Sequence, residues 1–428
     1  MSSRNWESAG AIAVRAAVLA VSTSLCVLPV SASAEDWSLR STQSETVEFN
    51  DNMFLQNPNP GYTVGSYTGI TSNAEARTPT SKFDLDSNVN YRKYWGPGAE
   101  AAPQTESLSY GFTGHYESYG KNTFDRNFVE SSFSSQSSAF ALLDQLGVLS
   151  GVNGAVDQFT LRGGIDRALT ARDTISVNAQ STHTFYDPSG AGTAFTDTLA
   201  SGIWQHRLNA NLSLSSSTQA EWLSYENTLG TDVLILRNQE GVDVSFSPLL
   251  SFRGSAGAAY IKTENGVNTL TSIGAPGASG SLSSSSVGFI TDMLLTYKAL
   301  KSTTFTLSAT QTVGPTIVGS LYQVGILRAG MTHTINSHSS LSLAADVSRT
   351  ISTNTTDFAS ASIAYSHELT REWNAQISYR HLHRFASSGS ATFDPITGTP
   401  ILSGTGPADS NSILVVVSKS ITILPHSN

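Results

Sequence analysis

The stretch FDLDSNVNYR, residues 83–92, alternates apolar and polar side chains along most of its length. Phe83, Leu85, Val89 and Tyr91 occupy alternate positions, and acidic, amide and basic side chains lie between them. Successive side chains of a β-strand point to opposite faces, so a period of two predicts a strand with one apolar and one polar face.

The same alternation recurs along the chain and predicts eighteen strands. They cover residues 36–49, 62–77, 82–95, 104–119, 123–140, 157–168, 173–186, 194–207, 211–226, 231–246, 249–263, 284–298, 302–315, 321–334, 339–351, 357–368, 373–386 and 411–424. Short turns and mostly longer polar loops connect these segments in alternation, as in the barrels of outer membranes. Sixteen strands is the alternative.

An even number of strands lets the first strand pair with the last, so that no sheet edge remains. We therefore predict that residues 35–428 form one all-β domain, a transmembrane antiparallel up-and-down β-barrel. Its partners would be outer-membrane lipid and the barrel-assembly machinery of a Gram-negative bacterium. The alternative is a secreted β-sandwich array or β-solenoid rich in serine and threonine.

Residues 1–34 have the features of a secretory signal peptide. Arg4 and Arg15 supply the positive charge, residues 16–30 are apolar, and small residues precede the expected cleavage site. We predict that the mature chain begins at Glu35, which mass spectrometry of the membrane fraction would check.

The only cysteine, Cys26, lies inside this leader, so the exported chain is expected to contain no disulfide and no thiolate nucleophile. An acylated Cys26 at the mature N-terminus would contradict the predicted cleavage. The formal net charge is −9, from 24 basic and 33 acidic residues, and loss of two arginines and one glutamate with the leader makes it −10. This balance argues against a nucleic-acid partner, because such proteins present clustered Lys and Arg.

Charged residues on the polar faces are the candidate lumen-lining residues. By alternation they are Asp84, Asp86, Arg92, Glu117, Arg162, Asp166, Arg328, Asp346, Arg380 and Arg384. A lumen lined by both signs of charge orders water and filters small polar solutes. The alternative is a filled lumen in which these charges pair with one another.

The connection at residues 141–156 differs from the other outer loops because it is apolar. Leu142, Leu143 and Leu146 are its candidate constriction residues, since apolar side chains at a cell surface bury against something. If the segment folds into the lumen, deletion of residues 142–149 should raise channel conductance and leave folding intact. Unchanged conductance would leave the segment as a packed hairpin extension or an interface.

No catalytic or cofactor site is predicted. His381 and His383 share one strand face, a spacing that can present two imidazoles to a metal, but no third ligand is evident nearby. No serine stands in a nucleophile-elbow sequence, and the glycine-rich stretch at residues 273–280 lacks the lysine of a phosphate-binding loop. We therefore predict a protein that is not an enzyme and needs no cofactor.

Several motifs resemble a known family. VEFNDNMFL at residues 47–55 is similar to the signature that opens the porin-like β-barrel proteins of exopolysaccharide and capsule loci. DQLG at 144–147, LTARDT at 169–174 and LTREW at 369–373 resemble later parts of the same family. The resemblance implies an outer-membrane barrel linked to surface polysaccharide, and it transfers no active site.

The end of the chain departs from the usual outer-membrane pattern. The last predicted strand is followed by Pro425-His426-Ser427-Asn428 and not by a terminal aromatic residue, which weakens the expected recognition by the assembly machinery. The preferred prediction is a channel for small polar solutes or for surface polysaccharide. The alternatives are a structural or adhesive barrel with a filled lumen, and an outer-membrane hydrolase.

Overall fold

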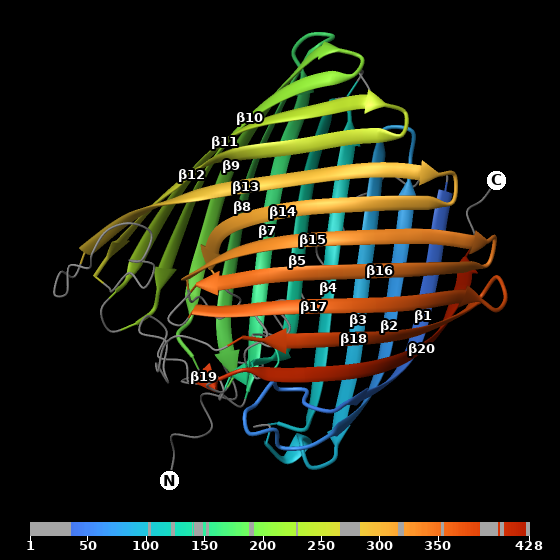
Figure 1. Ribbon diagram of the computed structural model, residues 1–428. Coiled ribbons are helices and arrows are strands. Elements are labelled where there is room, and N and C mark those ends of the chain that lie inside the picture. The colour runs from blue at the N-terminus through green and yellow to red at the C-terminus, as the bar shows by residue number, and fades with distance from the viewer. Residues whose placement is uncertain are drawn as a thin grey trace.

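The chain forms a closed barrel of eighteen antiparallel strands (Figure 1). This computed structural model describes residues 36–101, 104–120, 125–138, 140, 149–150, 154–187, 192–227, 230–265, 283–315, 321–351, 355–385, 401–402 and 406–424. The strand number and the all-β class predicted from the sequence are confirmed. Within the described part of the chain, no helix is long and apolar enough to cross a bilayer.

The barrel strands follow one another around the wall in chain order. They are β1 (Asp36–Asn50), β2 (Thr63–Arg77), β3 (Ser81–Trp95), β4 (Glu106–Tyr119), β5 (Arg126–Ser137), β7 (Ala155–Ala168), β8 (Asp173–Asp187), β9 (Phe195–Asn209), β10 (Leu212–Tyr225), β11 (Asp232–Ser247), β12 (Leu250–Glu264), β13 (Ser283–Leu300), β14 (Thr303–Pro315), β15 (Leu321–Asn336), β16 (Ser339–Ile351), β17 (Thr355–Glu368), β18 (Trp373–Arg384) and β20 (Ala408–Leu424). Their ends differ from the expected ones by a few residues at most.

Three short elements lie outside the barrel wall. A 3₁₀ helix, η1 (Ala99–Ala101), follows β3, and β6 (Leu149–Ser150) pairs with β19 (Ile401–Leu402). The sequence did not predict these elements, because two-residue strands are too short to show an alternating pattern.

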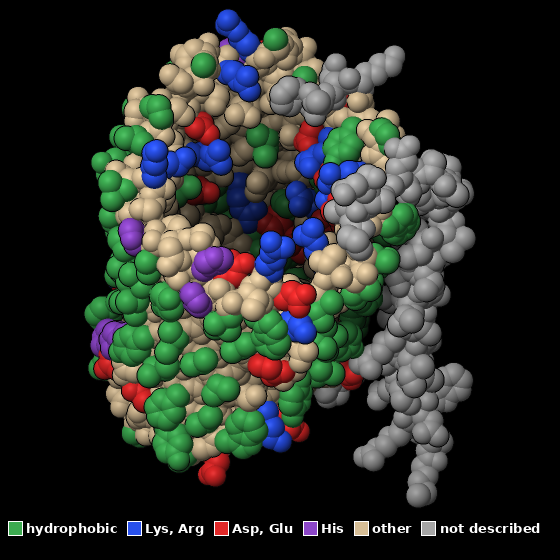
Figure 2. Space-filling view, turned by 90° about the vertical axis from the view of Figure 1, so that its right-hand side faces the viewer, with side chains coloured by type: hydrophobic (Ala, Val, Ile, Leu, Met, Phe, Trp, Pro, Cys, Tyr) green, Lys and Arg blue, Asp and Glu red, His purple; other side chains and the backbone are tan. Residues whose placement is uncertain are grey.

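The outer wall of the barrel is apolar. On β3, Leu85, Val89 and Tyr91 are 37%, 46% and 41% exposed, although they are large apolar side chains. Similar residues are exposed on strands all around the barrel, and apolar side chains cover much of the outer wall in Figure 2. A wall of this kind is suited to contact with lipid, as the alternation predicted.

The barrel closes where β1 pairs with β20, from Leu39 opposite Leu424 to Asn50 opposite Ser412. The turn after β1 holds this junction at its outer end. Asp51 accepts hydrogen bonds from both the backbone and the side-chain nitrogen of Asn411, at 2.7 and 2.6 Å. The sequence motif at residues 47–55 therefore forms the junction at which the barrel closes.

Two further side chains of this turn continue the junction. Ser410 Oγ donates to Asn50 Oδ1 at 2.9 Å, and Asn52 Nδ2 donates to the carbonyl of Asp409 at 3.0 Å. Because Asn52 Oδ1 also accepts from the backbone of Gln56 at 3.0 Å, the same residue fixes the curve of the turn. The asparagines of the motif thus have a structural role.

The wall is not paired over its full height between β13 and β14. Their pairing ends with Thr291 opposite Gln311, whereas β13 continues outwards beside β12 to Ser283. Two side chains bridge this unpaired part of the wall. Gln311 Nε2 donates to the carbonyl of Phe289 at 3.0 Å, and Arg237 Nη2 donates to the carbonyl of Val313 at 2.6 Å.

An apolar cluster of described residues lies beside this gap. Ile235 and Ile261, on the face opposite exposed Leu236 and Tyr260, are fully buried. They pack in one cluster with Val313 and residues of neighbouring strands. The expectation of a polar lumen face throughout is therefore wrong for the outer half of β9–β13. There, apolar packing that includes Ile290 and Val313 accompanies the two hydrogen bonds across the gap between β13 and β14.

Candidate functional site

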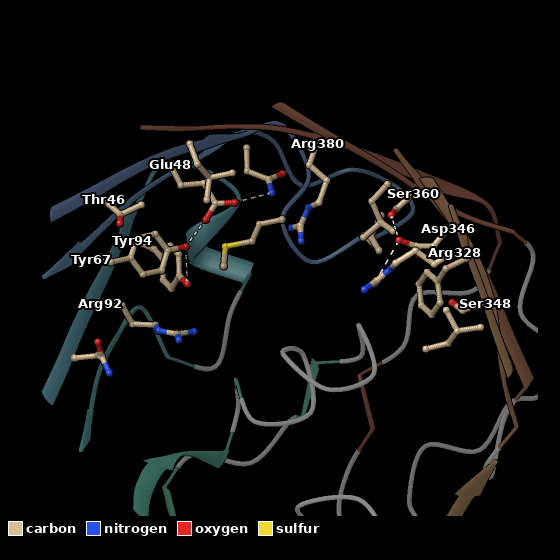
Figure 3. A pocket seen from close by; sticks show the side chains of 18 of the residues that line it. Thr46, Glu48, Tyr67, Arg92, Tyr94, Arg328, Asp346, Ser348, Ser360 and Arg380 are labelled. Carbon is tan, nitrogen blue, oxygen red and sulfur yellow. Dashed lines mark hydrogen bonds and ion pairs between the residues drawn. The ribbon is translucent and has the colours of Figure 1, made fainter. Parts of the chain in front are cut away.

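A cavity of about 610 Å³ lies inside the barrel, between β1–β3 on one side and β15–β18 with β20 on the other. Charged and aromatic side chains face each other across it (Figure 3). From the end that carries the short turns of β13–β18, the barrel is hollow and basic and acidic side chains are visible within it (Figure 2).

A buried carboxylate organises the wall formed by β1–β3. Glu48 is 6% exposed, and its Oε1 accepts a hydrogen bond from Asn50 Nδ2 at 3.2 Å. Its Oε2 accepts one from the hydroxyl of Tyr67, which lies 3.1 Å from the hydroxyl of Tyr94. Both oxygens of Glu48 are therefore engaged, and the two tyrosine rings are held edge to face, with centroids 5.7 Å apart.

Arg92 lies on the same wall and contacts aromatic rings. Its guanidinium carbon is 5.6 Å from the ring centroid of Tyr67 and 5.6 Å from that of Phe140. A guanidinium over an aromatic face keeps its charge while its position is restrained. Arg92 is therefore a fixed positive charge at the edge of the cavity.

Two arginines face this wall from the other side of the cavity. Arg328 Nη2 lies 3.6 Å from Asp346 Oδ1, which also accepts a hydrogen bond from Ser360 Oγ at 2.8 Å. The Arg328 side chain is 58% exposed, so this ion pair is open to water. Arg380 extends into the cavity between the two groups, and among the residues that the structure describes no hydrogen bond or ion pair to its side chain is found (Figure 3).

The described residues that line the cavity carry charges of both signs. They include the arginines Arg92, Arg328 and Arg380 and the carboxylates of Glu48 and Asp346, and both carboxylates already accept hydrogen bonds from protein groups. A confined space lined by an excess of one sign concentrates ions of the opposite sign. Among the described lining residues, basic side chains outnumber acidic ones.

A second group of charges, on the β3–β7 wall, is internally paired. Arg126 bridges Glu117 at 3.0 Å and Asp166 at 2.7 Å, and Lys82 Nζ lies 3.0 Å from Asp84 Oδ1. These groups satisfy one another, as the filled-lumen alternative expected. Because the opposite charges of each pair lie close together, their fields largely cancel in the lumen.

The structure places all ten predicted lumen-lining residues on the faces opposite the exposed apolar side chains, but it does not gather them in one site. Arg92, Arg328, Asp346 and Arg380 meet at the cavity, whereas Asp84, Glu117 and Asp166 belong to the paired wall. The others have separate contacts: Asp86 accepts from Asn73 at 2.7 Å, Arg162 lies over the ring of Phe128 at 5.3 Å, and Arg384 donates to the carbonyl of Gly406 at 3.1 Å.

The predicted constriction residues Leu142, Leu143 and Leu146 lie outside the described residues. The structure does place both flanks of their segment. Phe140 is 3% exposed and packs against Tyr94 with ring centroids 5.3 Å apart, and Leu149 pairs with Leu402. The constriction therefore stays a prediction.

Glu48, Tyr67 and Tyr94 build one wall of the cavity and are not among the residues predicted from the sequence. Glu48 was detectable, because it alternates with exposed Val47 and Phe49 in the first strand. The tyrosines carried no such signal, since an aromatic residue on either face fits a strand of a membrane barrel. Met53 and Leu55, from the turn after β1, also line the cavity.

The histidines considered as metal ligands lie on the outer face near the rim. His381 Nδ1 is 2.9 Å from Asn411 Oδ1, and His383 Nδ1 is 2.7 Å from Asp409 Oδ1. Within the described ranges, no group of three potential metal ligands is found.

One serine and one histidine are in contact elsewhere on the outer wall. Ser339 Oγ lies 2.8 Å from His367 Nδ1, near the end of the barrel that carries the short turns. A hydrolytic triad would also need a carboxylate that orients this imidazole. None is found in contact with His367 in the part of the chain that the structure describes.

A closed barrel with an apolar outer wall and a charged interior defines the class of this protein: it is an outer-membrane β-barrel. No protein-family model matches the chain, and no curated protein sequence matches it.

Solved structures that align with the chain include transporters and receptors. The FrpB iron transporter from Neisseria meningitidis (F5-1 variant) aligns with a TM-score of 0.49 and 7% identity over 90% of this chain and 82% of that one. The ferric-catecholate import receptor Fiu from E. coli K12 gives 0.44 and 7% over 89% and 81%, and the copper transporter OprC gives 0.44 and 7% over 90% and 80%. Structural similarity at these TM-scores and identities does not indicate what this chain binds or transports.

Proposed function

We propose that this barrel is a porin-like channel for small polar solutes and that it favours anionic ones. The observation that carries the proposal is the pair of guanidinium groups of Arg328 and Arg380, which line one cavity; the Arg328 side chain is 58% exposed and Arg380 extends into the cavity. Rings of basic side chains select anions in pores, because they stabilise a partly dehydrated anion and repel a cation.

The class of solute that we connect with this channel is an anionic saccharide. The resemblance of residues 47–55 to barrels of polysaccharide loci supports a saccharide, and the arginines support a carboxylate or sulfate group on it. Tyr67, which is partly buried and lies beside Arg92, offers an aromatic ring at the cavity, which suits the combination of ring and charge in a uronic acid.

Reversal potentials in planar bilayers under a salt gradient test this proposal. We expect anion selectivity for the native barrel, and a shift towards cations for the double variant Arg328→Gln, Arg380→Gln. The matched control is Arg349→Gln, which removes the same charge from the outer wall, where Arg349 bridges Asp357 at 2.8 Å. It should leave the selectivity unchanged.

Two results would overturn the proposal. Stable channels whose selectivity is the same in the double variant would mean that these arginines do not select the passing ion. A well-folded barrel that never conducts would favour the second candidate, a structural barrel with a filled lumen. The apolar cluster around Ile235 and Ile261 and the ion pairs of Arg126 are the observations that support this second candidate.

A further inference from the structure

The outer wall carries a polar patch where β20, β1 and β2 lie side by side. Gln43 and Glu45 are exposed and share the outer face of β1 with Val47, which is 55% exposed. Thr68 lies opposite Glu45 on β2, and Lys419 lies opposite Gln43 on β20. We call Gln43, Glu45, Thr68 and Lys419 the junction patch.

The junction patch lies within the height of the apolar wall. On β1 the outward side chains of Trp37 and Phe49, 50% and 48% exposed, stand below and above Gln43 and Glu45. Aromatic residues mark the two interfaces of a bilayer, so Glu45 lies at the depth of the hydrocarbon. A charged group facing lipid there is costly, and in known membrane proteins such groups face other protein or water.

Contacts within the barrel satisfy Glu45 only in part. Thr68 Oγ1 donates to Glu45 Oε2 at 2.8 Å, and Gln43 Nε2 donates to Glu45 Oε1 at 3.4 Å, which is a long hydrogen bond. A carboxylate offers about four acceptor sites. The described residues supply two donors, so acceptor sites of Glu45 remain, and lipid offers no donor.

Lys419 supplies the complementary charge on the neighbouring strand. Its Nζ lies 5.3 Å from the ring centroid of Trp373, so the ammonium stays at the outer surface. An acid and a base on adjacent strands form a self-complementary pair, because a twofold axis along the membrane normal brings each opposite the other on a second copy.

We propose that the junction patch is the interface of a homodimer in the membrane. Glu45 of one barrel faces Lys419 of the partner barrel, and the two Gln43 side chains lie near the axis. The inference depends on the barrel lying in a membrane and does not depend on what passes through it.

A second polar patch, across the barrel on β10 and β11, provides the comparison. Glu240 accepts from Ser216 Oγ at 2.8 Å, and Asn238 donates to Thr218 Oγ1 at 3.0 Å. No lysine or arginine lies on this outer face of β10 or β11, since Arg237 is on the other face. If two copies met through this patch, the Glu240 carboxylates would face no basic side chain on the other barrel. This surface is therefore not complementary to a second copy of itself.

Cysteine crosslinking in native membranes distinguishes these surfaces. The only cysteine of the chain is Cys26, in the leader, so a single introduced cysteine is the reactive thiol of the mature protein. We expect Gln43→Cys to give disulfide-linked dimers on oxidation and Asn238→Cys to stay monomeric. Monomeric Gln43→Cys, or dimers formed equally by Asn238→Cys, would overturn the proposal.

A charge exchange tests the ion pair itself in the Gln43→Cys background. Lys419→Glu should cause a several-fold loss of crosslinked dimer, and adding Glu45→Lys should restore it, since the exchanged pair is again complementary. Urea unfolding checks that each variant is folded. Failure of the double variant to recover, with every barrel folded, would contradict the proposed contact.

Discussion

Replacing Val177 by arginine is expected to lower the free energy of unfolding of the barrel in a bilayer by about 2–4 kcal/mol. Val177 is 45% exposed on the outer face of β8, where it lies opposite Ile165 of β7. An arginine there would place a guanidinium in hydrocarbon, and only a long detour of the side chain to the interface would relieve the cost. Urea unfolding of barrels folded into vesicles measures the change.

The neighbouring position is the matched control. Asn178→Arg adds the same side chain one residue further along β8, on the face that points into the barrel. We expect a much smaller loss, because that face contacts water and polar groups. Equal sensitivity at the two positions would mean that the sheet does not separate lipid from a lumen.

The second large effect is expected at the junction of β1 and β20. Asp51→Ala removes the acceptor of two hydrogen bonds from Asn411, at 2.7 and 2.6 Å, and leaves a backbone N–H without its partner. Hydrogen bonds to a charged group contribute about 1.5–3 kcal/mol each, so the loss of two should lower the stability of the barrel by about 3–6 kcal/mol. Unfolding in urea, together with the yield of folded barrel, measures this loss.

Two variants bracket that result. Asp51→Asn keeps an acceptor for the backbone of Asn411 and should recover part of the stability. Asp86→Ala removes another aspartate, whose side chain accepts from Asn73 at 2.7 Å in an exposed position, and should change stability little. If Asp51→Ala behaved like Asp86→Ala, the turn after β1 would not be what holds the barrel closed.

The alternating pattern predicted the barrel well because it is a local consequence of burial on one face. Each strand shows the pattern within its own residues, as Leu85, Val89 and Tyr91 do on β3, and the number of strands then follows by addition. The short elements were missed for the same reason, since β6 and β19 are defined by a contact between segments far apart in the chain.

The wrong expectation concerns strands that are apolar on both faces. On β11, Val233 and Ile235 are buried on one face while Leu236 on the other is 42% exposed. A run without alternation does not say which side meets lipid. The structure decides it, because the buried apolar cluster beside the gap between β13 and β14 lies on the inner face of these strands.

The residues of the cavity show the same division. Alternation placed Arg92, Arg328 and Arg380 on inner faces, but it did not show that they meet around one space or that Asp84 and Glu117 lie in paired groups elsewhere. Glu48 and Tyr67 contact each other through a pairing of strands that no single segment reveals.

The sequence by itself determined the strands, their number and, where they alternate, their two faces, because these depend on the period of side chains along each segment. Tertiary structure alone decided which charges are neutralised and which remain available to a solute, because pairing depends on distances across the lumen. Those distances are set by the register of many strands around a closed wall. Arg126 and Arg380 carry the same guanidinium group, and only the closed barrel places Arg126 beside Asp166 and Arg380 at the cavity.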